Sequence, residues 1–266
     1  MSQSGQDAPL PVRPHTLAHD RVDRPLAAFA RDYADRDDTG RHSHVRAQLL
    51  YAVAGVMRIA TDAASFVVPP GRALWVPAGL PHAVSMQGQV AMRALFVRGD
   101  AARAGPADTT VLVVSPLLRE LILAACAEPL EWDEAGRGGH LAALILDEIA
   151  RAATLPLGVP EPRDARLKRL ADALRADPAA PLTLDAWAMR SGASARTLRR
   201  LFQAETGMGF GRWRQMLRLA EAAALLAEGM PPARAAARVG YASAPAFGAA
   251  FRSAFGITPG TAGGPS

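Results

Sequence analysis

Two helices joined by a tight glycine turn are predicted over residues 183–206, which read TLDAWAMRSGASARTLRRLFQAET. Apolar residues fall at helical spacing on both sides of a short break, Ser191-Gly192-Ala193. Ser194 follows the break, where its side chain can accept hydrogen bonds from the free N–H groups of the second helix. The rest of the chain is organised around this helix-turn-helix pair.

The second of these helices has a basic outer face. With Leu198, Leu201 and Phe202 turned inward, Arg196, Arg199, Arg200 and Gln203 share the opposite face. Three guanidinium groups on one ridge suit an anion or the edge of a guanine, although a solvated basic face is the alternative. The turn and the N-cap favour a helix that reads DNA.

A second copy of the same pattern follows. A long amphipathic helix is predicted over residues 210–228, ended by Gly229. It carries Arg212, Arg214 and Arg218, which are weaker candidates for phosphate contacts or for a solvated face. Another helix covers residues 233–239, then a turn at Gly240, and Ser243 caps a last helix. The sequence therefore predicts an all-α domain with two helix-turn-helix units joined by a long helix.

These units carry a family resemblance. The segments SGASARTLRRLFQAETGMGFGRWRQMLRLAEAAALLAEG and VGYASAPAFGAAFRSAFGITPG resemble the DNA-binding domain of AraC-family transcriptional regulators. The resemblance implies double-stranded DNA as a partner, with base contacts from the first recognition helix. The second recognition helix departs from the family pattern, because alanine, proline and glycine occupy most of its outward positions. The residues assigned to DNA are Arg196, Thr197, Arg199, Arg200, Gln203, Ser243 and Arg252.

Charge and composition support this division. Residues 164–266 hold fourteen Lys and Arg against seven Asp and Glu, whereas the whole chain of 266 residues has a net charge of only +5. The basic surplus therefore lies in the helix-turn-helix half, as binding to DNA requires. No apolar run is long enough to cross a bilayer and no hydrophobic signal region is recognised. A single cysteine, Cys126, fits a reducing compartment, so we expect a cytoplasmic protein without a membrane partner.

Two proline-containing stretches mark the expected boundaries. Residues 1–24 are polar and aperiodic and are predicted to be a disordered lead. Residues 154–163 contain three prolines and a glycine and are predicted to be an interdomain linker. The expected domains are therefore an effector-binding and dimerisation domain at 25–153 and the DNA-binding domain at 164–266.

The region between these stretches is rich in short β-like runs. They cover residues 49–59, interrupted by Gly55, and then 65–68, 73–76, 83–86 and 91–97. Short strands at regular spacing predict a sandwich or barrel. Helices are predicted at 116–127 and 139–153, and we expect a homodimer to form through them. The fold class is thus α+β with several domains, a barrel with trailing helices followed by the helical domain.

Three histidines carry the chemistry that this barrel offers. His42 and His44 are two apart, Gln48 lies four residues further on, and His82 follows the turn PAGLP. The stretches HSHVRAQ and PAGLPH resemble the two motifs of the cupin barrel, whose histidines and an acid bind a divalent metal. The resemblance implies a metal site at His42, His44, Gln48 and His82. Gln48 stands where metal cupins usually have glutamate, so this site has less charge compensation.

Two other interpretations of the cluster remain open. It can line a pocket for a small organic effector, with imidazoles as hydrogen-bond donors, or be a structural remnant inside the barrel. His15, His19 and His140 are expected at the surface.

Three functions are weighed. The first is a one-component transcriptional regulator in which a small molecule or a metal bound by a jelly-roll sensor controls promoter binding. The second is a metal-dependent cupin enzyme, a dioxygenase or isomerase, with a helical appendage, and the third is a DNA-architectural protein without a ligand. The helix-turn-helix resemblance favours the first. In addition, QLLYAVAGVM with PPGRALWVPAGLPH resembles a subgroup that represses a neighbouring transporter gene.

Overall fold

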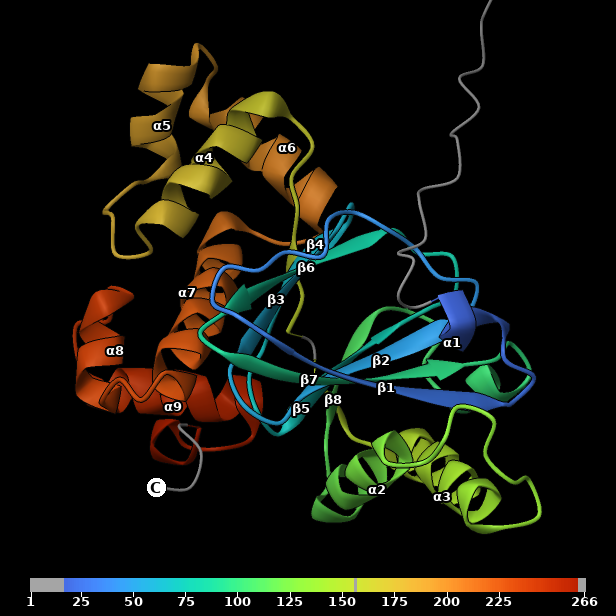
Figure 1. The fold of residues 1–266 in the computed structure, drawn as a ribbon. Coiled ribbons are helices and arrows are strands. Elements are labelled where there is room, and N and C mark those ends of the chain that lie inside the picture. The colour runs from blue at the N-terminus through green and yellow to red at the C-terminus, as the bar shows by residue number, and fades with distance from the viewer. Residues whose placement is uncertain (1–16, 156, 263–266) are drawn as a thin grey trace, which may run out of the picture.

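The computed structural model describes residues 17–155 and 157–262. It has a strand-rich part and a helical part, as the sequence predicts (Figure 1). The main strands are β1 (Leu26–Tyr33), β2 (Ala47–Ala52), β3 (Val56–Thr61), β4 (Ala64–Val68), β5 (Arg72–Val76), β6 (His82–Gln87), β7 (Val90–Val97) and β8 (Thr110–Val113). Two short strands, β9 (Thr154–Leu155) and β10 (Val159–Pro160), follow later in the chain.

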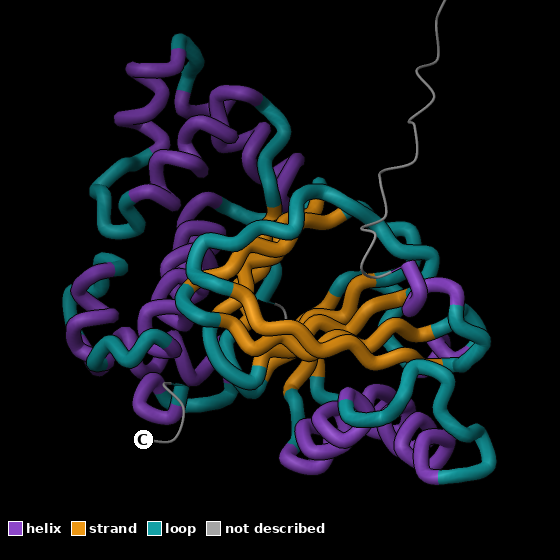
Figure 2. The backbone as a smooth tube through the Cα atoms, in the orientation of Figure 1, coloured by secondary structure: helices purple, strands orange, loops and turns teal. Residues whose placement is uncertain are grey.

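The strands form two antiparallel sheets that enclose a core. Over the described residues, one sheet has the order β1-β7-β2-β5-β8-β9 and the other β10-β4-β3-β6 (Figure 2). Leu50, Val76 and Phe96 of the first sheet pack with Ile59 and Val84 of the second. Because both sheets contribute to one apolar cluster, the strand-rich part is a sandwich-like barrel with its core between the sheets.

The predicted run at residues 49–59 becomes two strands in different sheets. β2 pairs with β5 and β7, whereas β3 pairs with β4 and β6. The chain changes sheet at Gly55, which has φ +77°, and a Cβ there would lie 2.3 Å from the carbonyl oxygen of Gln89. Only glycine fits this turn without strain.

Two helices cover the outer face of the larger sheet. α2 (Pro116–Cys126) starts at Ser115, whose side chain accepts a hydrogen bond from the Leu118 amide, and α3 (Arg137–Arg151) packs beside it. Leu118, Ile122 and Ile145 bury against Leu49 and Trp75 of the sheet. Cys126 lies in this layer, and burial raises the pKa of its thiol to about 11. Its thiol is therefore protonated at neutral pH.

The N-terminal lead ends earlier than the sequence predicts. Residues 1–16 lie outside the described part, but α1 (Leu17–Arg21) belongs to the fold. Asp20 is buried, and the guanidinium of buried Arg46 donates to the backbone carbonyls of Asp20, Val22 and Arg24. Burial lowers the pKa of Arg46, yet three carbonyl acceptors satisfy its donors. Arg46 lies 22 to 26 residues beyond the carbonyls that it binds. The composition of the N-terminal segment alone therefore does not indicate that the segment is ordered.

The expected linker is fixed to both sheets. β9 pairs with β8 at the edge of the larger sheet, and β10 pairs with β4 at the edge of the smaller one. Pro160 tolerates this position because its missing N–H costs little at the edge of a sheet. The stretch 154–163 therefore connects the two parts through β-pairing over its described residues, rather than as a free spacer.

The helical part consists of two small units joined by a long helix. Asp164, Thr183, Ser194 and Ser243 each cap a helix by accepting a backbone N–H, which explains where four of the helices begin. Sequence reasoning did not single out the first of these helices, α4. The helices are α4 (Ala165–Ala176), α5 (Leu184–Ser191), α6 (Ala195–Thr206), α7 (Phe210–Ala227), α8 (Pro232–Arg238) and α9 (Ala244–Phe255). Each helix of the described residues is too short or too polar to cross a membrane.

The helical part packs directly on the smaller sheet. Val56 and Val67 of the sheet share one apolar cluster with Leu170, Leu198 and Trp213. The Trp213 indole donates to the Pro160 carbonyl at 2.7 Å. This contact buries side chains from both parts, which holds the two together.

Polar contacts reinforce the same interface. Arg58 of β3 donates to both carboxylate oxygens of Glu221 on α7, at 2.7 and 2.6 Å. Arg72 of β5 donates to the Phe255 carbonyl at the end of α9 at 3.1 Å. The barrel therefore contacts both the long helix α7 and the helix α9 of the helical part.

Candidate functional site

Three histidines meet inside one end of the barrel. His42 and His82 form an isolated bridge, and each backbone amide donates to the carbonyl of the other at 2.9 and 2.8 Å. His44 follows on the same irregular stretch and packs edge-on against Phe96, with ring centroids 4.9 Å apart. All three side chains are buried, and their nearest ring nitrogens lie within 4.8 Å of one another. The structure thus brings together three residues that the sequence separates by up to 40 positions.

The Nδ1 atom of each ring faces an oxygen on the periphery of the cluster. His42 Nδ1 lies 2.8 Å from the Gly40 carbonyl, and His82 Nδ1 lies 3.0 Å from the Leu80 carbonyl. His44 Nδ1 lies 2.9 Å from a carboxylate oxygen of Asp20. An oxygen of this kind accepts, so Nδ1 carries the proton in each ring and Nε2 is the nitrogen that would bind a metal ion. This arrangement of outer acceptors is the one that orients histidine ligands around a metal ion.

Gln48 supplies a fourth donor atom beside these rings. It lies on β2, and its Oε1 is 3.1 Å from His82 Nε2. Burial, and the neighbouring His42 and His44, lower the pKa of His82 to about 4, so this ring is neutral at pH 7. Because His82 Nδ1 donates to the Leu80 carbonyl, His82 Nε2 and Gln48 Oε1 are both hydrogen-bond acceptors, and they face each other. Either the amide turns so that its NH₂ donates, or a cation lies between the two atoms.

Asp20 is the residue of this site that sequence reasoning missed. Its side chain is buried, one oxygen contacts His44, and the other, Oδ1, has no hydrogen-bond partner within the described part of the chain. A buried carboxylate beside three imidazoles supplies the negative charge that Gln48 lacks. Sequence reasoning missed this carboxylate because Asp20 falls in the stretch predicted to be disordered.

The remaining histidines lie apart from the cluster. His140 is exposed on α3, as predicted, and His15 lies outside the described residues. His19 is half-buried rather than at the surface, because it packs between Phe29 and Phe96. Burial lowers the pKa of its ring.

The donor set fits a transition metal. Neutral imidazole nitrogens suit Zn²⁺, Ni²⁺, Cu²⁺ and Fe²⁺, and an amide oxygen completes a four-atom set. His42, His44, His82 and Gln48 are the residues that would hold the ion, and Asp20 would hold His44 in position. An ion bound there would act as a Lewis acid or as a purely structural centre.

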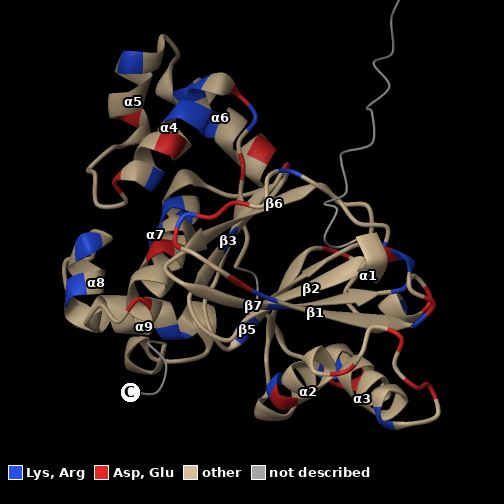
Figure 3. Ribbon diagram, in the orientation of Figure 1, with Lys and Arg blue, Asp and Glu red and all other residues tan. Residues whose placement is uncertain are grey.

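The second candidate surface is the outer face of α6. Arg196, Arg200 and Gln203 are exposed, and the side chain of none of them has a hydrogen bond or ion pair with another described residue. Arg199 is exposed too and contacts both carboxylate oxygens of Asp185 on α5, at 2.8 and 2.7 Å. Thr197 is half-buried and its hydroxyl lies 2.9 Å from the Ser194 cap. Figure 3 shows basic residues on this unit and on the second one.

The face of α9 is much less polar. Ser243, Arg252 and Ser253 are exposed, and the other exposed residues of this helix are Ala244, Pro245, Ala246 and Ala249. Ser243 also caps the helix, accepting from the Ala246 amide at 3.4 Å. Small side chains permit close approach to a phosphate backbone but offer few groups to read bases.

Two of the three arginines on α7, which were weaker candidates for phosphate contacts or for a solvated face, bind backbone carbonyls of the protein instead. Arg214 donates to the carbonyls of Ala180 and Leu182, and Arg218 donates to those of Pro178 and Gly240. Gly240 has φ +81°, and a Cβ there would lie 2.6 Å from the Arg218 guanidinium. These arginines brace the connection between α4 and α5 and the turn between α8 and α9. Arg212, the third, lies beside the barrel.

Comparisons with known proteins agree with this layout. A family model described as a helix-turn-helix domain matches residues 187–262, and one described as a cupin domain matches residues 32–98. The chain is 30% identical over 219 residues to the HTH-type transcriptional regulator NimR of Escherichia coli K12, covering 82% of this chain and 80% of NimR. The chain belongs to the AraC family of transcriptional regulators. As a family member it is a DNA-binding regulator of transcription with a cupin ligand-binding domain, and the enzyme alternative is not favoured.

Further matches are shorter or more distant. The regulator RipA of Corynebacterium glutamicum is 40% identical over 111 residues, which cover 42% of this chain and 32% of RipA. ToxT of Vibrio cholerae aligns with 90% of this chain and 97% of its own, at 8% identity and a TM-score of 0.37. An AraC-type DNA-binding protein of Chromobacterium violaceum aligns with 37% of this chain and 88% of its own, at 29% identity and a TM-score of 0.35.

Proposed function

We propose that this AraC-family regulator responds to a divalent transition-metal ion held by His42, His44, His82 and Gln48. One observation carries the proposal: every Nδ1 faces an outer oxygen, and the three buried imidazoles bring one ring nitrogen each to within 4.8 Å of one another. The metal then acts as the effector, and it changes promoter binding if it binds one arrangement of sensor and DNA-binding domain more tightly than another. The resemblance to a transporter-repressing subgroup makes repression of a neighbouring exporter the proposed output.

Metal removal tests this response. Preferred sequences are first selected from a random DNA pool with the full chain purified without an affinity tag. Affinity for the selected DNA is then measured for metal-free protein and after addition of Zn²⁺ or Ni²⁺. We expect a shift of about 5- to 150-fold, the usual range of allosteric coupling. Unchanged affinity, with no gain in thermal stability, would favour a small organic effector in the barrel instead.

We propose that the first helix-turn-helix unit reads bases, through Arg196, Thr197, Arg199, Arg200 and Gln203, while Ser243 and Arg252 of the second unit contact phosphates. Support comes from the exposed, polar face of α6 and the small side chains of α9. The domain boundaries proposed for this division are 25–153 and 164–266, with residues 17–24 added to the sensor because Arg46 binds them. The location proposed is the cytoplasm, where the chromosome of a bacterial relative lies.

Substitutions on α6 should change the sequence preference, whereas a substitution on α9 should change the affinity for all sequences. Arg196→Ala or Arg199→Ala is expected to lose about 1–3 kcal/mol of binding to the preferred sequence and to relax the preference at one position. Arg252→Ala should weaken binding to all sequences alike and reduce the slope of log K against log salt by about one. Fluorescence anisotropy with matched and mismatched duplexes measures both. Equal losses on all sequences for Arg196→Ala and Arg199→Ala would reduce these residues to phosphate contacts.

We propose a homodimer formed through the outer faces of α2 and α3. Leu117 is 53% exposed and Leu144 is 49% exposed, and they lie on the two helices that cover the larger sheet. Burying both against a second copy removes apolar surface from water. Leu144→Glu is therefore expected to convert a dimer to a monomer in light scattering after size exclusion. Met189→Glu, a change at another exposed apolar residue, should leave the dimer intact.

A further inference from the structure

One row of cross-strand neighbours crosses the smaller sheet from the histidine cluster to the DNA-binding domain. His42 bridges to His82 of β6, and His82 pairs with Thr61, the last residue of β3. Thr61 closes the β3–β4 turn onto Ala64, and Ala64 pairs with Pro160 of β10. The row therefore spans four strand spacings of about 4.8 Å, or roughly 19 Å, with two of the proposed metal ligands at one end.

Pro160, at the other end of the row, contacts the DNA-binding domain. Its carbonyl accepts the Trp213 indole N–H at 2.7 Å, and Trp213 packs edge-on against Phe202 of α6, with ring centroids 5.4 Å apart. The linker also contacts α6 directly, because the Asp164 amide donates to a carboxylate oxygen of Glu205 at 2.9 Å. A displacement of Pro160 therefore acts on the helix that carries the proposed base contacts.

Thr61 holds the middle of the row with one hydroxyl group. Its Oγ1 donates to the Ala64 carbonyl at 2.9 Å and accepts the amides of Ala63 and Ala64 at 3.3 and 3.0 Å. The Ala63 carbonyl in turn accepts the Glu161 amide, next to Pro160, at 2.9 Å. Because Thr61 is buried, loss of its hydroxyl leaves two amides of the turn without this acceptor.

β10 is the segment of this row that separates most easily. Within the described chain it pairs with β4 at two residues, whereas β6 pairs with β3 along its whole length. One of the two residues is Pro160, which has no N–H to donate. A strand held so weakly has two accessible arrangements, paired and unpaired, and its contact with Trp213 links them to the position of the DNA-binding domain.

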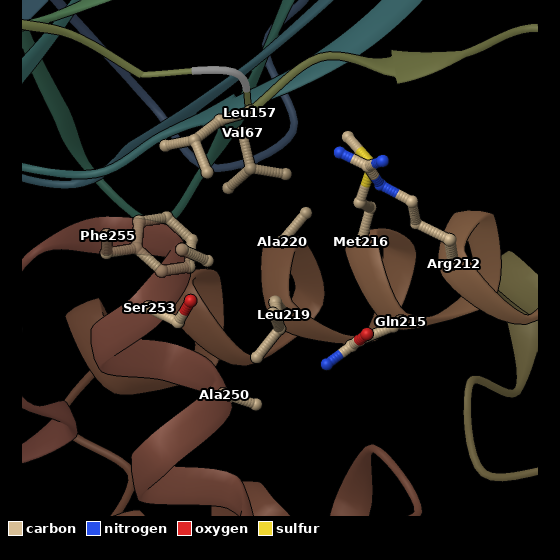
Figure 4. A pocket seen from close by; sticks show the side chains of 11 residues that line it. Val67, Leu157, Arg212, Gln215, Met216, Leu219, Ala220, Ala250, Ser253 and Phe255 are labelled. Atoms are coloured by element: carbon tan, nitrogen blue, oxygen red, sulfur yellow. The ribbon is translucent and has the colours of Figure 1, made fainter. Parts of the chain in front are cut away.

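The packing of β4 on α7 leaves space for such a movement. Figure 4 shows Val67 of β4 facing Met216 and Ala220 of α7, and a cavity of about 230 Å³ lies between the strand and the helix. A small shift of α7 relative to β4 therefore meets empty space on this side rather than a filled core.

We propose that this row transmits metal binding from the histidine cluster to the first helix-turn-helix unit, with Thr61 as the positioning residue at its centre. The inference rests on the proposed metal effector. With an ion in place, the distance between His42 and His82 is fixed, which sets the position of β6 beside β3 and hence the pairing of β10. Metal-bound protein keeps β10 paired, and metal-free protein releases it more often.

Thr61→Val tests this role, because valine keeps the shape of threonine and removes the hydroxyl. DNA affinity is measured with and without Zn²⁺ for the wild type, Thr61→Val and Thr61→Ser. We expect the wild-type change of about 5- to 150-fold to fall to about 2-fold or less in Thr61→Val and to be restored in Thr61→Ser. Thr61→Val should still bind about one ion per chain, which a loss of folding or of the metal site would not allow.

Thr39→Val is the matched control. Thr39 is also buried, and its hydroxyl accepts the Val84 amide at 2.9 Å, but it lies on the side of β6 away from β3. Thr39→Val should keep the wild-type change in DNA affinity. If Thr61→Val also keeps that change while metal acts on the wild type, the row is overturned and the metal effector stands.

Hydrogen exchange, measured by NMR on metal-free protein, separates this inference from the proposed effector. We expect the Glu161 amide to exchange about 2- to 10-fold faster in Thr61→Val than in the wild type, because a weaker turn loosens its bond to the Ala63 carbonyl. His82→Ala should have the same effect from the other end of the row, and Thr39→Val should not. If metal leaves the DNA affinity of the wild type unchanged, the effector proposal fails and these rates still decide the row. Unchanged exchange in Thr61→Val and His82→Ala overturns it.

Discussion

Replacing His82 by alanine is expected to reduce bound divalent metal from about one ion per chain to a small fraction of that. His82 is 1% exposed, and its Nε2 faces both His42 and the Gln48 oxygen, so its loss removes one ligand and leaves the others misaligned. The measurement is metal content by mass spectrometry, on protein purified without a tag or chelator. His140→Ala, at an exposed histidine, is the control and should retain the metal.

Two milder substitutions test whether loss of metal in His82→Ala results from loss of folding. Asp20→Asn keeps an acceptor for His44 but removes the buried charge, and we expect about 10- to 100-fold lower metal affinity. Gln48→Glu supplies a charged ligand and should raise the affinity. A Gln48→Glu protein that binds metal no better than the wild type, together with metal-free wild-type protein, would contradict the metal site.

Much of the helical domain was predictable because its signals are local. Ser194 and Ser243 cap the helices that they precede, and Gly192 ends α5 in the left-handed conformation. The apolar spacing of Leu198 and Phe202 likewise places both residues in the core. Each of these signals lies within one or two turns of its effect, so pattern reasoning captures them.

The parts that sequence reasoning missed depend on distant partners. Asp20 belongs to the site only because Arg46 and His44 hold α1 against the barrel. Arg214 and Arg218 were predicted as weaker candidates for phosphate contacts or for a solvated face. In the structure each donates to backbone carbonyls more than 20 positions away. A side chain whose acceptor is a carbonyl leaves no mark in the sequence of its partner. Predictions from sequence are therefore wrong mainly for buried arginines and for stretches rich in proline.

The interface between sensor and DNA-binding domain gives the second large effect. Arg58→Glu places a negative charge against Glu221, whose side chain is 16% exposed, where the wild type has a bidentate pair. Breaking a buried pair costs about 3–5 kcal/mol. The Arg58 side chain is 33% exposed, so we expect about 1–3 kcal/mol here, as weaker docking of the two domains. Thermal unfolding and limited proteolysis within residues 154–163 measure it, because Trp213 of α7 donates to the Pro160 carbonyl in β10.

The reversed pair decides between a specific contact and a general effect of charge. Arg58→Glu combined with Glu221→Arg restores opposite charges at the same positions and should recover most of the loss, giving a favourable coupling energy in the double-mutant cycle. Arg98→Glu changes a surface arginine that pairs with Asp23 and Asp100 inside the sensor, and should cost less than about 1 kcal/mol. Since α7 joins both helix-turn-helix units, weaker docking should also reduce the change in DNA affinity on effector binding. Full retention of that change in Arg58→Glu would mean that the signal reaches the DNA-binding domain by another route than this ion pair.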